Sequence, residues 1–294
     1  HIATGAYAAA VSEAGALGVI GAGGIKLDKL RQEILLAKSL TDKPFGVNLL
    51  LLHPEIEEQA KLVEELGVEV VTTGAGNPGR FVESWKEKGI KVFPVVAEPA
   101  LAIRMARLGV DGLIAEGSEA GGHIGTMTTM TLIPQVLDRV DLPVIAARGI
   151  ATGEQLLAVE VLGASGVQMG TLFLATEECP IHQNYKDKII NSNYANSKVI
   201  GRSVNMPLRL LNNPMVREYL AMEKLGKDKD ELEHYTLGAL RKAVHDGNLD
   251  EGSFMAGLVV SQIHDILPVK ERLEQLFTEY DNLRKRFIHE NSES

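Results

Sequence analysis

The feature that most constrains this fold is a regular alternation of short apolar runs with stretches of helical periodicity. One strand–helix unit takes roughly 20 to 25 residues, and several strands are apolar on both faces, as in parallel sheets covered on both sides. This alternation predicts either an open doubly wound α/β sheet or a TIM-type (β/α)8 barrel. The predicted strands are Leu17–Ile20, Phe45–Leu51, Glu69–Thr73, Lys91–Val96, Asp111–Glu116, Leu142–Ala147 and Ser165–Met169.

The barrel is our preferred prediction, because seven strands and one before His1 would make the eight that a closed barrel needs. The chain opens at His1 without an initiator Met, so we expect the first strand to be missing from it. After Thr171 the alternation of predicted strands and helices ends. We predict a barrel over residues 1–176, a smaller helical and loop subdomain over its mouth at 177–250, and C-terminal helices within 251–290 that pack on the barrel. The helices predicted there are Leu232–His245, Ser253–Ile263 and Val269–Ile288.

Composition excludes several classes of protein. The net charge of -9 and the aromatic content of 5% argue against a nucleic-acid binder, which needs clustered cations and stacking platforms. No apolar run approaches the roughly 20 residues that span a bilayer. The single cysteine, Cys179, excludes a disulfide framework and a cysteine-based zinc site, and it suits a reducing cytoplasm. We therefore expect a cytoplasmic protein that acts on small molecules, with no metal and no nucleic-acid or membrane partner.

In βα barrels the working residues lie on the loops after the strands. Every such loop in this chain is glycine-rich or polar, so that backbone N–H groups can approach a large ligand. The predicted loops comprise residues 21–24, 48, 74–77, 116–123, 148–149 and 168–171.

The last two of these loops predict a phosphate site, since barrels often bind phosphate between the loops after their final strands. Gly149 and Gly170 would expose N–H donors, and Thr171 adds a hydroxyl group. The alternative is that both loops are tight turns required for packing. No Rossmann fingerprint and no Walker motif is present, which favours flavin mononucleotide (FMN) over a tightly held dinucleotide.

The loop Glu116–Gly125 holds four glycines and one histidine, His123. Histidine is the side chain best suited to proton transfer near neutral pH, so the pattern is typical of an active-site loop. It is equally compatible with an ordinary βα turn whose histidine is exposed.

Four motifs together resemble one family, the nitronate monooxygenase-like flavoproteins, and within it the FMN-dependent enoyl-acyl-carrier-protein (enoyl-ACP) reductases II. The later stretches Asn184–Lys186 and Gly252–Gly257 resemble the same reductases, so the likeness covers nearly the whole chain. The four motifs are Lys43–Asn48, Thr72–Pro78, Glu116–Gly125 and Val167–Thr171.

The resemblance implies a TIM-type barrel that binds FMN, with His123 as the catalytic residue beside the flavin. Two residues depart from the family pattern: Arg148 stands where the family usually has glycine, and Leu258 replaces an expected glutamine. The family's opening strand and its Gly-Gly-Met loop are absent before His1. The cofactor-binding residues implied are Asn48, Glu116, Gly121, Gly122, Gly149, Gln168, Met169, Gly170 and Thr171. For Arg148, which we also predict to bind the cofactor, two outcomes are open: its guanidinium pairs with the phosphate in a bidentate way, or its bulk crowds the turn.

The function implied is reduction of trans-2-enoyl-ACP with NADH or NADPH, the last step of the bacterial fatty acid elongation cycle. A nitronate monooxygenase that uses O2 is the alternative enzyme, and a flavin- or phosphate-binding barrel without catalysis is a third reading. We also expect a homodimer. A run of cations near the middle of the chain predicts docking of the acidic carrier protein, although scattered surface charges explain it equally well. These cations are Lys186, Lys188, Lys198, Arg202, Arg209 and Arg217.

Overall fold

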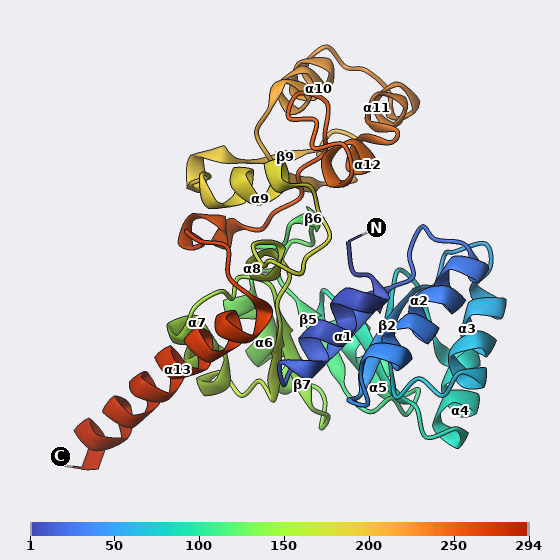
Figure 1. Ribbon diagram of the computed structural model, residues 1–294, viewed down its shortest axis with the longest axis vertical. Coiled ribbons are helices and arrows are strands. Elements are labelled where there is room, and N and C mark those ends of the chain that lie inside the picture. The colour runs from blue at the N-terminus through green and yellow to red at the C-terminus, as the bar shows by residue number, and fades with distance from the viewer. Residues whose placement is uncertain (1, 293–294) are drawn as a thin grey trace.

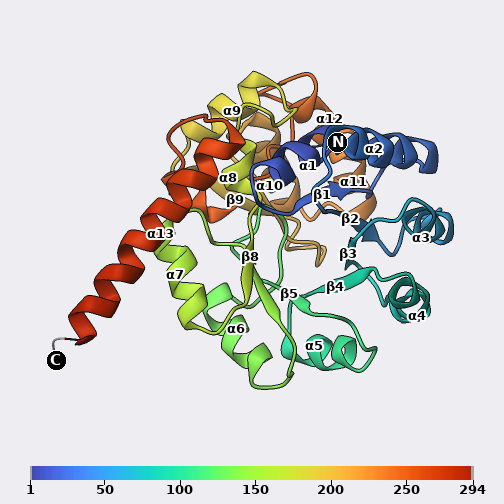
Figure 2. The ribbon, with the colours of Figure 1, turned by 60° about the horizontal axis from the view of Figure 1, so that its bottom comes forward.

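The computed structural model describes residues 2–292, and within them seven parallel strands form one curled sheet in the order β1-β2-β3-β4-β5-β7-β8. Figure 2 shows the strands as an arc with helices on its outer side. The TIM-type fold is confirmed, and each predicted strand lies within two residues of an observed one. The strands are β1 (Gly18–Gly21), β2 (Phe45–Leu50), β3 (Val70–Gly74), β4 (Lys91–Val96), β5 (Leu113–Glu116), β7 (Val144–Ala147) and β8 (Gly166–Gln168).

The helices between the strands bury one face against the outside of the arc. Trp85 is fully buried there, and its indole N–H donates to the carbonyl oxygen of Ala60 at 3.2 Å, which satisfies the polar edge of a ring in an apolar layer. The helices are α1 (Gly5–Glu13), α2 (Leu27–Leu40), α3 (Ile56–Glu65), α4 (Gly79–Glu87), α5 (Pro99–Ala106), α6 (Thr129–Leu137) and α7 (Gly153–Val161).

The first and last strands of the arc, β1 and β8, do not pair with each other. No strand among residues 2–292 lies between them. Side-chain contacts join the two ends instead: the Tyr7 hydroxyl in α1 donates to the carbonyl oxygen of Phe173 at 2.6 Å and lies 2.7 Å from the Thr176 hydroxyl. Helix α1 thereby ties the start of the described chain to the segment after β8.

Beyond the short helix α8 (Thr171–Leu174) the chain forms a second body above the barrel mouth, which we call the cap (Figure 1). The cap has an apolar core of its own that includes Leu210, Val216, Tyr219 and Leu232. Its elements are α9 (Gln183–Ile190), the 3-10 helix η1 (Tyr194–Asn196), β9 (Ser197–Ile200), β10 (Leu208–Leu211), α10 (Pro214–Lys224), α11 (Lys229–Thr236) and α12 (Ala239–Val244).

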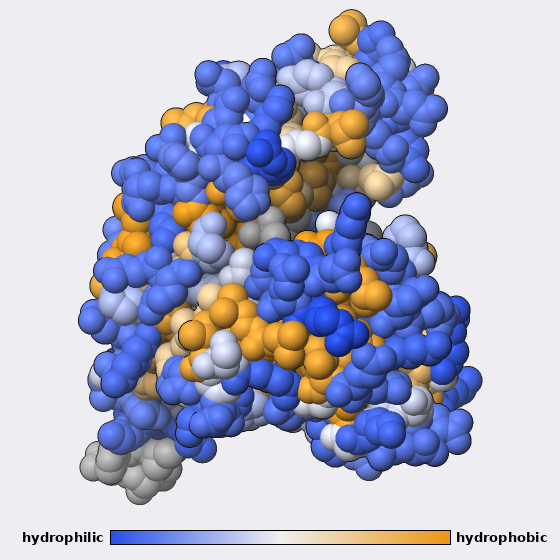
Figure 3. Space-filling view, turned by 45° about the vertical axis from the view of Figure 1, so that its right-hand side comes forward, coloured by the Kyte–Doolittle hydropathy of each residue, from blue (hydrophilic) through white to orange (hydrophobic). Residues whose placement is uncertain are grey.

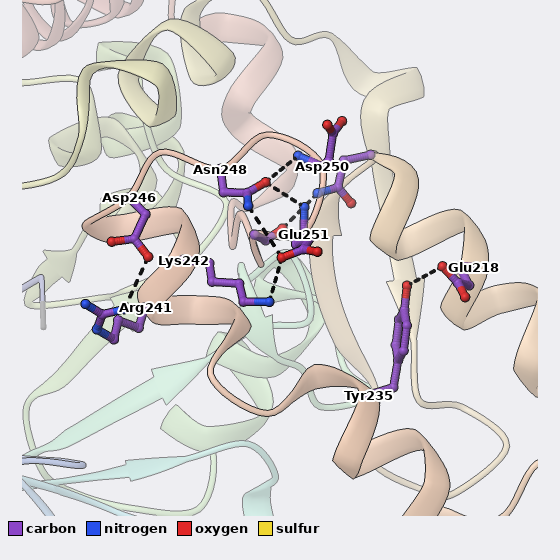
Figure 4. Close-up of polar contacts among 10 residues, drawn as sticks. Glu218, Tyr235, Arg241, Lys242, Asp246, Asn248, Asp250 and Glu251 are labelled. Atoms are coloured by element: carbon purple, nitrogen blue, oxygen red, sulfur yellow. Dashed lines mark hydrogen bonds and ion pairs between the residues drawn. The ribbon is translucent and has the colours of Figure 1, made fainter.

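Polar contacts hold the outer end of the cap together (Figure 4). The Tyr235 hydroxyl donates to Glu218 at 2.8 Å, and the Lys242 ammonium reaches Glu251 at 2.6 Å. The Tyr235 pKa is raised to about 12 by burial and by this carboxylate.

Two predicted helices were wrong. Leu232–His245 is broken into α11 and α12, because Gly238 takes a φ of +76°, which ends one helix before the next begins. Ser253–Ile263 holds only the 3-10 helix η2 (Leu258–Gln262), since the residues before it run extended across the barrel mouth. There the Leu211 N–H donates to the carbonyl oxygen of Phe254 at 2.8 Å, which takes the backbone away from helical bonding.

The last helix, α13 (Val269–Ser292), includes the predicted Val269–Ile288 and runs along α7 (Figure 1). Before it, the returning chain meets the outgoing chain at a β-bridge between Thr176 and Leu267. None of the helices in the described chain is long and apolar enough to cross a membrane. The same residues hold no cluster of His, Cys, Asp and Glu that fits a metal ion.

Candidate active site

The loops after β5, β7 and β8 meet the segment 255–259, which runs into η2, at the mouth of the barrel and beneath the cap, and enclose a small pocket. This convergence follows from topology, because the C-terminal ends of parallel strands all lie at one end of a barrel. The pocket is lined by Glu119, Ala120, Gly121, Arg148, Gly149, Ile150, Met169, Gly170, Thr171, Gly257 and Val259.

Backbone donors face this pocket from two loops. In the described chain the N–H groups of Gly149, Gly170 and Thr171 have no hydrogen-bond acceptor. Gly149 has a φ of +71°, which glycine adopts without strain and which keeps its N–H out of regular secondary structure. Unpaired donors beside a hydroxyl group are what a phosphate monoester requires, so the residues present fit the phosphate of FMN.

Thr171 holds the floor of the pocket in place. Its hydroxyl oxygen accepts the N–H of Gly257 at 2.9 Å, which leaves its own proton free to donate. Gly257 allows this approach, because a Cβ there would lie 2.7 Å from the carbonyl oxygen of Glu119. The segment that was predicted to be helical therefore serves as one wall of the pocket.

Glu119 belongs to the pocket, although the sequence analysis did not select it. Its carboxylate accepts the Thr129 N–H at 3.0 Å and the Thr129 hydroxyl at 3.0 Å, at the start of α6. Its carbonyl oxygen accepts the N–H of Leu258 at 3.0 Å. Glu119 therefore holds the glycine-rich loop against both α6 and the segment 255–259. Its carboxylate already accepts hydrogen bonds from Thr129.

Arg148 also lines the pocket and lies directly after β7. Its guanidinium contacts one carboxylate oxygen of Glu116, with Nε at 2.9 Å and Nη2 at 2.5 Å. The two side chains are 30% and 20% exposed, so solvent screens the pair only in part. The backbone of Arg148 has a φ of +85°, a conformation in which a Cβ is strained.

His123 is carried by a short strand, β6 (Gly122–His123), which pairs with β10 of the cap rather than with the barrel sheet. Its side chain is exposed. Gly121 brings this strand close to the wall, because a Cβ there would meet the backbone of Ala256 at 2.6 Å. Glycine is required at this position for the close approach.

Arg209, in β10 of the cap, binds the glycine-rich loop that carries His123. Its guanidinium donates to the carbonyl oxygen of Ser118 in the loop and to the hydroxyl of Ser197 in β9, both at 3.1 Å. Its pKa is lowered by burial and by neighbouring Arg202, against the charge of Glu119, which raises it. Arg209 thus joins the cap to the loop that carries His123.

Four predicted site residues besides His123 lie outside the pocket lining. Asn48 is at the end of β2, where its amide oxygen accepts the Thr72 hydroxyl at 2.9 Å. The others are Glu116, Gly122 and Gln168. Apart from Glu119, the lining residues absent from the sequence predictions are Ala120, Ile150, Gly257 and Val259. The stretch Met255–Gly257, which lies within the family-like segment Gly252–Gly257, was the sequence signal that could have identified Gly257 as a lining residue.

The docking prediction for Lys186 was wrong, because this side chain is buried and its ammonium donates to the carbonyl oxygen of Glu177 at 2.9 Å. Lys188 is half-buried, bonded to the carbonyl oxygen of Asn212 at 3.0 Å, and lies over the Phe254 ring. Lys198, Arg202 and Arg217 are exposed on the cap.

Figure 3 shows the surface hollowed between the cap and the barrel, with apolar residues inside the hollow. A cleft of this kind, apolar and edged by a few polar groups, suits a small organic substrate.

The sequence family described as nitronate monooxygenase matches residues 1–66 and 58–279. The chain belongs to the nitronate monooxygenase family. A probable nitronate monooxygenase of Staphylococcus saprophyticus is 36% identical over 293 residues, which cover 82% of this chain and 81% of that protein. An indene-carboxyl-CoA dehydrogenase of Rhodococcus jostii is 34% identical over 208 residues, which cover 71% of this chain and 59% of that protein.

Among solved structures, FabK from Thermotoga maritima is 43% identical with a TM-score of 0.94, over 98% of this chain and 92% of that chain. The match therefore includes both barrel and cap. The resemblance read from the motifs is confirmed. Members of the nitronate monooxygenase family are flavin-dependent oxidoreductases, so this chain is an enzyme of that class.

Proposed function

We propose that this protein is an FMN-dependent enoyl-ACP reductase, which reduces trans-2-enoyl-ACP to acyl-ACP with NADH or NADPH. The observation that carries the proposal is the likeness to FabK, at 43% identity across barrel and cap together. The motifs Thr72–Pro78 and Gly252–Gly257, which resemble enoyl-ACP reductases II, support the same choice.

In this proposal the pocket at the barrel mouth holds the phosphate of FMN. The N–H groups of Gly149, Gly170 and Thr171 donate to it, and Thr171 adds its hydroxyl group. Asn48, Glu116, Gly121 and Gly122 would bind the ring region of the flavin, as the resemblance implies. When bound, reduced FMN supplies a hydride to Cβ of the enoyl thioester.

His123 completes the reaction at the substrate. As Cβ gains hydride, negative charge develops on the thioester oxygen and on Cα, and it needs a proton or a hydrogen bond. The imidazole of His123 is exposed at the end of the glycine-rich loop, where it is free to donate. The open hollow between the cap and the barrel, which holds apolar residues, would receive the substrate (Figure 3).

The reduced nicotinamide and the enoyl substrate would use this one site in turn, in a ping-pong order. This order needs no separate dinucleotide-binding fold, in line with the absence of a Rossmann fingerprint from the sequence. The acidic carrier protein would dock on the cap at Lys198, Arg202 and Arg217, which are exposed.

Oxidation of alkyl nitronates with O2 is the second candidate, because the relative from Staphylococcus saprophyticus is a probable nitronate monooxygenase. An anaerobic experiment separates the two functions. The flavin is reduced with NADH or NADPH, and crotonyl-CoA is then added. A reductase reoxidises its flavin with crotonyl-CoA. A flavin that stays reduced until O2 is admitted would contradict our proposal, and a flavin that responds to neither would indicate a barrel without catalysis.

A further inference from the structure

We propose that Glu116 and Arg148 form an opposed pair of charges that sets how tightly the pocket holds a phosphate monoester. Arg148 supplies the one side-chain cation of the pocket lining in the described chain, and Glu116 weakens its pull on the anion. The inference rests on the proposed function, because the monoester it addresses is the phosphate of FMN.

The backbone of Arg148 is the first observation. Its φ of +85° is strained for an L-residue, whereas glycine adopts this conformation freely. The turn itself therefore favours glycine at this position. Strained backbone of this kind is concentrated at binding and active sites, and Arg148 lines this pocket.

The orientation of the guanidinium is the second observation. Glu116 engages Nε and Nη2, and Nη1 has no hydrogen-bond partner among residues 2–292. Nη1 lies 3.7 Å from the position that a Cβ on Gly170 would occupy. The free nitrogen of Arg148 thus lies beside Gly170, whose N–H is also unpaired, and the two donors can bind the same anion.

The charges near the pocket are the third observation. Glu119 lines the pocket with a negative charge, and Glu116 adds a second one next to Arg148. Arg148 is the one cation among the lining residues of the described chain and faces the carboxylates of Glu116 and Glu119, of which Glu119 also interacts with Arg209 of the cap. An anion therefore depends on Arg148 and is opposed by Glu116, and partial burial of the pair limits the screening of both effects.

The experiment titrates full-length protein, stripped of any bound flavin, with inorganic phosphate, FMN and riboflavin at low and moderate salt. Riboflavin lacks the phosphate and is the matched ligand control. Arg148→Gly should weaken phosphate and FMN binding about tenfold, leave riboflavin binding unchanged and reduce the salt dependence. Arg148→Lys keeps the positive charge but loses the planar guanidinium. Its affinity for phosphate and FMN should lie between those of the wild type and Arg148→Gly.

Glu116→Gln is the decisive variant, because glutamine keeps the shape and one acceptor oxygen but removes the negative charge. It should tighten inorganic phosphate binding about fivefold and steepen its salt dependence. In the double variant Glu116→Gln with Arg148→Gly, most of the gain in phosphate affinity should disappear, because Glu116 acts on the anion by weakening the attraction of Arg148.

Two results would overturn the inference: an unchanged ratio of FMN to riboflavin affinity in Arg148→Gly, or weaker phosphate binding in Glu116→Gln. The second would make Glu116 a support that merely orients the arginine. Both differ from failure of the proposed function. A wild-type protein that binds phosphate and FMN as described, yet never reoxidises with crotonyl-CoA, would refute the reductase proposal and leave this pair of charges standing.

Discussion

The backbone of His123 pairs with that of Leu208, so the histidine of the glycine-rich loop belongs to the sheet of the cap and not to the sheet of the barrel. The next residues continue the link, with the Ile124 N–H donating to the carbonyl oxygen of Pro207 at 3.1 Å. The position of the proposed proton donor therefore depends on the cap, whereas the position of the pocket depends on the barrel.

Replacing His123 with alanine should lower turnover of crotonyl-CoA by about a hundredfold or more, because the charge that develops on the thioester loses its proton donor. Reduction of the flavin by NADH or NADPH should be nearly unchanged. Stopped-flow spectroscopy of the two half-reactions measures both. Wild-type turnover by His123→Ala with FMN bound would remove the histidine from the mechanism.

Arg209→Met should lower kcat for crotonyl-CoA about tenfold with a smaller change in KM, because the loop before His123 loses its bond to Ser118 while the cleft keeps its shape. Arg209→Lys should restore part of kcat. The matched control is Arg202→Met, an exposed neighbour whose loss should leave this small substrate unaffected. Equal losses in kcat for both variants would contradict the positioning role.

Charge reversal of Lys198, Arg202 and Arg217 to glutamate should raise KM for an ACP-bound enoyl substrate severalfold, and leave KM for crotonyl-CoA unchanged. Arg209 is left intact, since its change would disturb the loop. Lys61→Glu, on the exposed face of α3, is the control for net charge. An equal increase in KM for both substrates would count against docking at the cap.

Gly121→Ala should destabilise the protein by about 1–3 kcal/mol and weaken FMN binding, because the added methyl group meets the backbone of Ala256. Gly74→Ala is the control, since nothing lies within 4 Å of its Cβ position. Thermal unfolding and flavin fluorescence report the two effects. If Gly121→Ala were as stable as Gly74→Ala, the backbone at Ala256 would be able to shift at little cost, which would contradict this prediction.

Cys179 should resist iodoacetamide at pH 8, because it is buried and burial raises the pKa of its thiol to about 11. A raised pKa in the folded state stabilises the protein below the unfolded value of 9.0, and this contribution is lost as the pH rises through about 11. Labelling monitored by mass spectrometry should follow unfolding. Rapid labelling of native protein at pH 8 would contradict the buried environment.

The strands of the barrel were predictable because each is a local apolar run, and their meeting point at one end follows from parallel topology. Strand β6 was not predictable in this way. Gly122 and His123 carry no strand pattern, and they pair with Leu208 and Arg209, which are far away in the sequence. Strand structure there is imposed by the partner, which a local pattern cannot reveal.

The same limit applied to the site. The sequence predicted that Arg148, Gly149 and Thr171 lie near one another. It could not show that Glu116 binds Arg148 or that Glu119 accepts a hydrogen bond from Thr129. Such contacts depend on the directions of side chains on loops that are far apart in the sequence. Ser253–Ile263 had helical spacing, yet contacts with Leu211 and Thr171 drew its first half into an extended wall.

The bridge between Thr176 and Leu267 has a mechanical consequence. The chain leaves the barrel for the cap after Thr176 and returns from it at Leu267, and this isolated bridge joins the two passes side by side. Both ends of the segment that includes the cap are therefore anchored at one point of the barrel mouth. Because β10 pairs with β6, a displacement of the cap about that point would be transmitted to the backbone of His123.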